Sequence, residues 1–163
     1  MLTAVVSAAI RRRIGCYTLD PDLASSAMNA ERKRLIQRSW ESIARDHDRI
    51  AVAFYDRLFE IDVPARAMFS KVDMDAQRAK FVVMLGEIVR HLDLPENLIP
   101  ALRALGQRHR EYGVRPIDYD RVREALFSAI AGELGDGFTD ELREAWEEAY
   151  ALISSVMQRA GQG

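Results

Sequence analysis

The sequence predicts an all-α fold, and three observations carry this prediction. From Asn29 onward, apolar residues return every three or four positions, which is the period of an amphipathic helix. Prolines and glycines fall near the ends of most periodic segments, where helices start and stop. No stretch of the sequence shows the strict alternation of a half-buried strand, and no internal repeat is visible. We therefore expect one all-α domain of about six to eight helices.

Three predicted helices occupy the chain as far as the segment PARAMF. The first places Ile36, Trp40 and Ile43 on one face and charged residues on the other. The second, HDRIAVAFYDRLFEID, turns its large side chains inward, namely Phe54, Tyr55, Leu58 and Phe59. The third is short and opens with Pro64, because proline suits the first position of a helix.

Two longer segments follow in the middle of the chain. One carries a single apolar stripe, formed by Phe81, Met84, Leu85, Ile88, Val89 and Leu92. The other is punctuated by Pro95 and Pro100 and ends at Gly113, a residue that commonly stops a helix. Its apolar row consists of Leu98, Leu102 and Leu105, and a histidine, His109, ends that row.

The last two predicted helices are separated by Gly135 and Gly137. Pro116 begins the first of them, whose inner face carries Tyr119, Val122, Leu126 and Ala129. Thr139 is a suitable N-cap for the second, and the acidic residues that follow it suit the positive end of the helix dipole. The inner face of this final helix carries Leu142, Trp146, Ala149, Ile153 and Val156.

Composition and charge argue against several classes of protein. A net charge of −2 and a pI near 6.0 give no reason to expect nucleic acid or an anionic membrane as a partner. No apolar run reaches the roughly 18 residues that would span a bilayer. The single cysteine, Cys16, cannot form an internal disulfide, which is typical of the reducing cytoplasm. We expect a cytoplasmic protein that is a monomer or a weak dimer.

Residues 1–27 lack the periodic pattern of the rest. A short apolar patch precedes three arginines, which reverses the charge order of a secretory signal. The part that follows is loop-like, with Asp20, Pro21 and two serines. We expect residues 1–27 to be an N-terminal extension, either disordered or produced by a mis-called start, and residues 28–163 to form the domain.

His109 is the polar residue whose position needs an explanation. It lies on an apolar row, and burying an imidazole costs free energy unless another group bonds to it. Either a neighbouring group satisfies it, as in many protein cores, or a metal does. No second ligand stands beside it at the spacing of a closed zinc site, whereas a haem iron needs only one strong protein ligand. His47 and His91 are most simply interpreted as solvated.

Four ordered segments resemble a known family: FYDRLFEIDVPARAMF, DAQRAKFVVMLGEIV, LGQRHREYGVRPIDYDRV and LGDGFTDELREAWEEAYALI. Together they look like a bacterial single-domain globin, similar to the haem domain of flavohaemoglobins and to the neuroglobin-like bacterial globins. The resemblance covers about residues 29–157. It implies a three-over-three helical sandwich around a b-type haem, with the globin domain over residues 28–163.

The resemblance also implies roles for residues on the proximal side of the haem. His109 matches the proximal iron ligand, and Phe69 matches the phenylalanine that wedges the haem edge. Val114 and Tyr119 match proximal positions near the histidine. The carbonyl of Leu105, one helical turn back, is within reach of the imidazole nitrogen that does not bind iron.

On the distal side, Tyr55 and Gln77 match the polar pair of the family, and Phe81 matches its bulky apolar residue. Gln77 and Phe81 lie on one helix face, so an amide is followed by an apolar wall. Phenol and amide donors would stabilise bound dioxygen by about 1–3 kcal/mol in a dry pocket. Without the resemblance, Tyr55 could be a packed aromatic with its hydroxyl at the surface, and Gln77 an exposed residue at a helix start.

Three departures from the flavohaemoglobin pattern bear on function. The chain ends at Gly163 without a glycine-rich dinucleotide loop, so we expect any reduction of ferric iron to come from an external reductase. Flavohaemoglobins place a glutamate against the proximal histidine, and the matching position here is Gly161. We therefore expect the histidine to donate less electron density to the iron, which weakens the activation of bound dioxygen. Arg108 is a candidate partner for a haem propionate, or else a solvated residue.

These features favour a haem protein that reversibly binds dioxygen at ferrous iron, for storage, transport or scavenging. The first alternative is a nitric oxide dioxygenase that works with an external reductase, so enzymatic activity is left open here. The second alternative is a haem-based gas sensor. The expected partners are dioxygen, nitric oxide or carbon monoxide, with no nucleic acid and no membrane.

Overall fold

The computed structural model describes residues 28–43 and 46–161, and the expectation for residues 1–27 lies outside this range. Within it the chain forms seven α-helices, one 3-10 helix and no strand, which confirms the all-α prediction. The elements are α3 (Ala30–Ile43), α4 (His47–Ile61), α5 (Val63–Met68), α6 (Met74–Arg90), α7 (Pro95–Glu111), α8 (Pro116–Leu134), η2 (Gly135–Gly137) and α9 (Asp140–Ala160).

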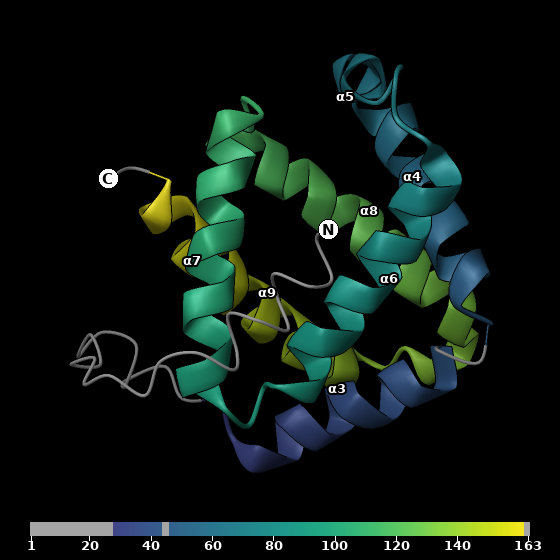
Figure 1. Ribbon diagram of the computed structural model, residues 1–163. Helices are drawn as coiled ribbons and strands as arrows, with labels where there is room; N and C mark the ends of the chain where they lie inside the picture. The colour runs from purple at the N-terminus through teal and green to yellow at the C-terminus, as the bar shows by residue number, and fades with distance from the viewer. Residues whose placement is uncertain (1–27, 44–45, 162–163) are drawn as a thin grey trace.

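The six longer helices form two layers of three, and the short α5 lies at one end (Figure 1). One layer consists of α3, α6 and α7, and the other consists of α4, α8 and α9 (Figure 1). Packing between the layers joins α7 to α9, α4 to α6 and α3 to α9, while α4 and α8 pack within their own layer. This is the three-over-three sandwich that the resemblance implied.

Capping residues explain where most of these helices begin and end. The Asp62 carboxylate accepts a hydrogen bond from the amide of Ala65 at the start of α5, and Asp73 does the same for the first amides of α6. Thr139 caps α9 through the amide of Leu142, as the sequence predicts. Gly113 has φ of 81° just beyond α7, a conformation that a residue with a side chain rarely adopts.

Helix α7 differs in one respect from the punctuated segment expected there. It starts at Pro95 and continues through Pro100 as a single helix. A proline at this position removes only one backbone hydrogen bond, the bond to the carbonyl four residues earlier. The row of buried leucines on α7 offsets that loss, because Leu98 and Leu102 are 6% and 2% exposed.

The core lies between the two layers and includes both tryptophans. Trp146 of α9 is buried, as expected, and its indole Nε1 donates to the hydroxyl of Ser39 at 3.1 Å. This bond joins α9 to α3 and satisfies two buried polar groups at once. Met28, where we expect the domain to begin, is buried as well. None of the described helices is both long and apolar enough to cross a membrane.

The expectation that His91 is solvated is wrong. Its side chain is only 17% exposed, and its Nδ1 lies 2.8 Å from the carbonyl oxygen of Glu87. His91 is the C-cap of α6, where the chain turns towards α7, and Leu98 and Leu102 of α7 line the same cavity as this imidazole. The side chain of His47 lies outside the described part of the structure.

Candidate functional site

Tyr55 of α4 and Gln77 of α6 form a polar pair inside an otherwise apolar region. The Gln77 amide nitrogen Nε2 donates to the Tyr55 hydroxyl oxygen at 3.0 Å. Tyr55 is 3% exposed, and burial raises the pKa of its phenol despite the hydrogen bond from Gln77 and the charge of Arg78. The phenol therefore keeps its proton. Neither alternative interpretation holds, because the Tyr55 hydroxyl is not at the surface and Gln77 is half-buried.

The direction of this hydrogen bond determines what the phenol can do. The Tyr55 oxygen accepts from the amide, so its own proton is available for a different acceptor. One of the two N–H groups of the Gln77 amide is used on Tyr55, which orients the phenol. Among the described residues, the Tyr55 hydroxyl thus has an amide donor but no acceptor for its own proton.

Aromatic side chains surround Tyr55 and fix the plane of its ring. Phe54 and Phe81 are stacked, with ring centroids 4.3 Å apart. The rings of Phe69 and Phe81 approach Tyr55 edge-on, at 5.5 Å and 5.8 Å. Phe59 lies 5.5 Å from Phe69 and thus supports that ring. The sequence placed Phe59 only in the core, although its spacing of four residues from Tyr55 indicates a shared helix face.

His109, near the end of α7, is the second centre of the site. Its Nδ1 lies 2.9 Å from the carbonyl oxygen of Leu105, which confirms the partner expected from the helix spacing. A carbonyl can only accept, so Nδ1 carries the proton and Nε2 holds a free lone pair. Burial lowers the pKa of His109, an effect that the hydrogen bond to Leu105 opposes, and the ring is therefore neutral. A neutral imidazole with a free Nε2 is a good metal ligand.

The turn after α7 and the start of α8 surround the histidine. The amide of Val114 donates to the carbonyl of His109 at 3.0 Å, and the ring of Tyr119 lies 6.3 Å from the imidazole. Tyr150 of α9 donates its hydroxyl to the carbonyl of Tyr119 at 2.7 Å. Tyr150 was not predicted, because its partner lies on another helix and no local pattern reveals it.

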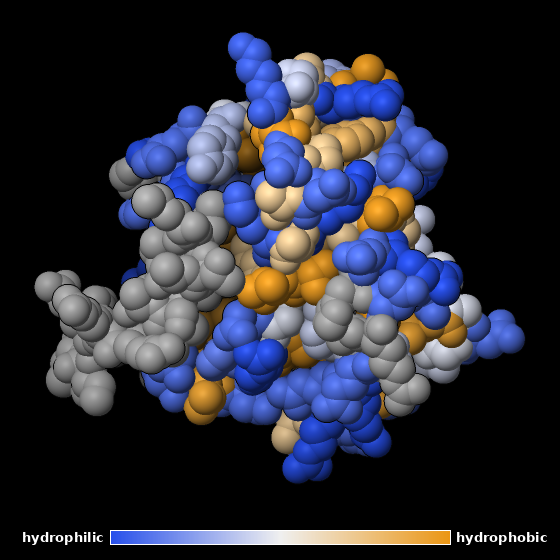
Figure 2. All heavy atoms as spheres, turned by 45° about the vertical axis from the view of Figure 1, so that its right-hand side comes forward, coloured by the Kyte–Doolittle hydropathy of each residue, from blue (hydrophilic) through white to orange (hydrophobic). Residues whose placement is uncertain are grey.

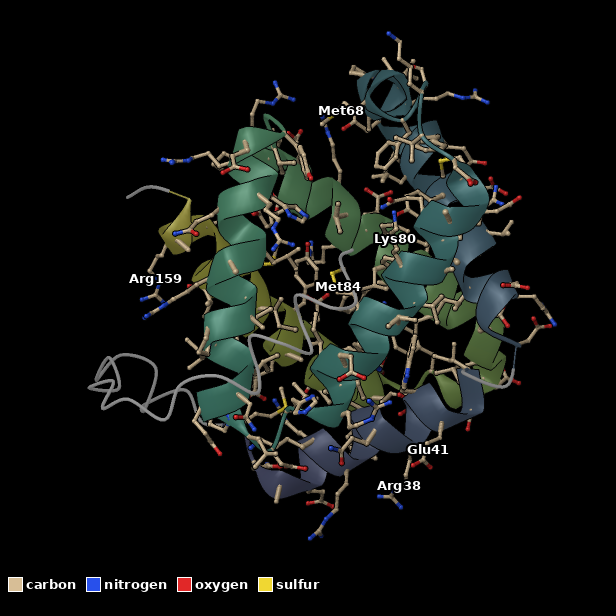
Figure 3. The ribbon with its side chains drawn as sticks, viewed as in Figure 1. Arg38, Glu41, Met68, Lys80, Met84 and Arg159 are labelled. Carbon is tan, nitrogen blue, oxygen red and sulfur yellow. The ribbon has the colours of Figure 1, made fainter. Side chains whose placement is uncertain are left out.

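The helices that carry the two centres are set apart from each other. Helix α6 packs against α4 and α3, and α7 packs against α9. The main contacts of α6 and α7 are therefore made with other helices and not with each other. A cavity of about 30 Å³ lies between them, lined mostly by apolar side chains that include Ile88, Leu102 and Leu105. Met84 points into this region (Figure 3). In Figure 2, hydrophobic atoms gather between hydrophilic ones on the face turned to the viewer.

The structure locates Gly161, the residue that the resemblance matches to the glutamate of flavohaemoglobins. Gly161 is the C-cap of α9, and a Cβ built there would lie 3.6 Å from the Cβ of Arg110 and 3.7 Å from the carbonyl oxygen of Gly106. This position therefore faces α7 close to His109. In the described residues, the hydrogen-bond partner of His109 is a carbonyl and not a carboxylate. Arg108 is half-buried, and its contact with a propionate stays a prediction.

A haem fits the side chains that are present here. Iron bound in a porphyrin already has four nitrogen ligands and takes one strong protein ligand, which the free Nε2 of His109 can supply. The ring of Phe69 and the side chains of Ile88 and Leu105 are apolar surfaces of the kind that contact a porphyrin. Tyr55 of α4 adds a single hydroxyl donor, which Gln77 of α6 holds.

Comparisons with known proteins agree with this architecture. A neuroglobin of Tetraodon nigroviridis is 28% identical over 145 residues, which cover 81% of this chain and 91% of that protein. A flavohemoprotein of Bacillus subtilis is 30% identical over 124 residues, which cover 74% of this chain but only 31% of that longer protein. A solved structure from Rhodothermus marinus, described as an engineered carbene transferase and a candidate nitric oxide dioxygenase, is 26% identical with a TM-score of 0.73. That match covers 83% of this chain and 94% of the other.

The match to a family model settles the assignment of the domain. The globin model matches residues 52–157, which is more than half of the chain and contains Tyr55, Gln77 and His109. Haem is the cofactor that this family and these side chains indicate. The chain belongs to the globin family.

Proposed function

We propose that this globin binds dioxygen reversibly through a haem held by His109. Ferrous haem supplies an iron atom that takes up dioxygen, and the protein supplies the ligand, the walls and the hydrogen-bond donor. The observation that carries the proposal is the bond from Gln77 to Tyr55, in which the phenol oxygen accepts and its proton stays available for another acceptor. A buried hydroxyl that served packing alone would be expected to donate to a protein acceptor, because buried polar groups are almost always paired.

His109 has two functions in this proposal. Its Nε2 is the iron ligand, and its protonated Nδ1 is held by the carbonyl of Leu105, which fixes the rotation of the imidazole ring. A carbonyl partner leaves the imidazole neutral, whereas a carboxylate would draw the Nδ1 proton and give the ring partial negative charge. The arrangement therefore favours binding of the gas over cleavage of its O–O bond.

Tyr55 and Gln77 determine how long the gas stays. The outer oxygen of bound dioxygen carries partial negative charge, and the Tyr55 hydroxyl is the donor that can stabilise it. Gln77 keeps the phenol in position through its amide and has a second N–H left. In a dry pocket, a donor of this kind stabilises bound dioxygen by about 1–3 kcal/mol, which lengthens the residence time of the gas roughly tenfold to a hundredfold.

Nitric oxide dioxygenation is the second candidate. It combines nitric oxide with dioxygen to give nitrate, and one electron from an external reductase is then needed for the next cycle. The same Tyr55 donor favours this reaction because it retains dioxygen until nitric oxide arrives. The likeness to a flavohemoprotein also supports it, although the chain spans only 31% of that protein. The carbonyl partner of His109 favours binding over turnover.

One experiment separates the two candidates. The protein is reconstituted with haem, reduced, exposed to air, and followed by absorption spectroscopy while nitric oxide is added together with a generic reductant. A spectrum of the oxygenated protein that turns ferric once and stays ferric is the expected result for a binding protein. Repeated return to the oxygenated spectrum, with nitrate accumulating, would place the dioxygenase first. Failure to form an oxygenated spectrum would contradict both.

A further inference from the structure

Gly106 lies at the closest approach between α7 and α9. A Cβ built on this residue would lie 2.2 Å from the backbone carbonyl oxygen of Met157 and 2.7 Å from its carbonyl carbon and Cα. Real side chains do not tolerate such distances, and the atoms in the way belong to a helix backbone rather than to a flexible side chain. Only glycine permits the two helix backbones to meet here.

The position of Gly106 on α7 connects this contact to the iron ligand. Gly106 follows Leu105, whose carbonyl oxygen holds the Nδ1 of His109 at 2.9 Å. It also precedes His109 by three residues, so both lie on neighbouring parts of the same helical turn. Any shift of the backbone at Gly106 therefore moves both the carbonyl that orients the imidazole and the imidazole itself.

Of the two helices, α7 is the one that would move. Helix α9 is bonded to other helices by Trp146 to Ser39 of α3, by Tyr150 to Tyr119 of α8, and by an ion pair with Arg123. Helix α7 packs chiefly against α9, and it lies in front of α9 in the view of Figure 1. To restore ordinary van der Waals contact, an added methyl group would have to separate the backbones by about 1 Å.

We infer that Gly106 is a positioning residue for His109, because it seats α7 against the backbone of Met157 and thereby sets the position of Nε2. This inference rests on the proposed role of His109 as the iron ligand. A displacement of about 1 Å at a reactive centre is enough to change its chemistry strongly. The close contact between α7 and α9 is thus part of the site and not only of the fold.

The test is the iron–histidine stretching band in resonance Raman spectra of the ferrous protein, recorded after photolysis of carbon monoxide so that the sixth position is free. Gly106→Ala should shift or broaden this band and speed haem dissociation by about tenfold or more. Gly132→Ala is the matched control, because a Cβ at Gly132 of α8 meets nothing within 4 Å. It should leave both the band and the haem dissociation rate unchanged.

A milder variant keeps the test decisive if Gly106→Ala does not fold. A Cβ at Gly161 would make only ordinary contacts, at 3.6 Å from the Cβ of Arg110 and 3.7 Å from the Gly106 carbonyl oxygen, so Gly161→Ala should leave the band in place. Gly161→Val extends two further methyl groups from that Cβ against α7, so it should displace the helix slightly and give a smaller shift of the same band. An unshifted band in a folded Gly106→Ala protein, or in Gly161→Val when the first variant fails, overturns the inference. A wild-type protein without any iron–histidine band contradicts the proposed function instead.

Discussion

At the scale of single residues, the hydrogen-bond directions around Tyr55 and His109 decide what the site can do. Gln77 donates to the phenol oxygen, which directs the phenol proton elsewhere. The Leu105 carbonyl accepts from Nδ1 of His109, which leaves Nε2 free. Both directions follow from which group is able to donate, because an amide nitrogen cannot accept and a carbonyl cannot donate. Tyr55 thus offers a hydrogen-bond donor, and His109 offers a lone pair on Nε2.

Replacing Tyr55 tests the first of these roles. In Tyr55→Phe the ring and its aromatic contacts stay, but the hydroxyl is lost, so dioxygen should dissociate about tenfold faster or more. Gln77→Leu removes the support of the phenol and the second amide N–H but keeps the hydroxyl, and we expect a smaller increase. Stopped-flow measurement of the dissociation rate compares the variants. Equal rates in wild type and Tyr55→Phe would mean that the phenol does not face the gas.

Ser39 and Trp146 provide a second test at the residue scale, this time of stability. Ser39→Ala leaves the buried indole Nε1 without its partner, which should lower the free energy of unfolding by about 1–3 kcal/mol. Ser42→Ala is the matched control, because Ser42 is exposed and bonds only to the carbonyl of Arg38 in its own helix. Urea unfolding of the apoprotein measures both. An equal effect of the two substitutions would show that the indole finds another partner.

At the scale of the elements, a chain of charged groups ties the start of α8 to the junction of α4 and α5. Arg121 donates to the buried carboxylate of Asp62 at 2.8 Å and to Asp118 at 3.1 Å. Asp118 also accepts from the side chain and the backbone amide of Arg115, at 2.9 Å and 2.8 Å. These bonds therefore connect the start of α8, which follows His109 in the sequence, with the start of α5, which precedes Phe69.

The pH dependence of stability follows from this chain. The side-chain hydrogen bond from Arg115 lowers the pKa of Asp118, and the bond to the backbone amide and the charges of Arg115 and Arg121 act in the same direction. In the unfolded state the pKa of this carboxyl is about 3.9. Between that pH and the lowered pKa of the folded state, the unfolded protein therefore binds more protons than the folded protein. The contribution of Asp118 is therefore complete above about pH 4 and is lost as the pH falls through the lowered pKa.

Asp118→Asn should accordingly be less stable than wild type at neutral pH, and the difference should shrink below about pH 4. Asp136→Asn, at an exposed position of η2, serves as the control. Urea unfolding at a series of pH values gives the comparison. A difference that is independent of pH would contradict the assigned role of the carboxylate.

The elements themselves were largely predictable from the sequence, and the exceptions have physical causes. Caps such as Thr139 and stops such as Gly113 act within a few residues, so local patterns reveal them. Pro100 was misleading because tertiary packing of α7 outweighs the loss of one helical bond. His91 looked solvated because the sequence does not show that α7 folds back over the end of α6.

At the scale of the whole molecule, the fold was predictable, but the connections between distant helices were not. The amphipathic period indicated the all-α class, and the resemblance located Tyr55, Gln77 and His109. The bond from Tyr150 to Tyr119 and the approach of Met157 to Gly106 join residues far apart in the sequence. Such contacts depend on how the two layers are packed, which no local pattern specifies.

The absorption spectrum of the His109→Ala protein after reconstitution with haem shows whether His109 holds the iron. His91→Ala is the matched control, because His91 is also largely covered and its Nδ1 also lies beside a carbonyl one turn back. We predict that His91→Ala keeps the ferrous spectrum of the wild type, whereas His109→Ala loses stable haem binding. A normal ferrous spectrum in His109→Ala would contradict the account, because it would show that another residue holds the iron.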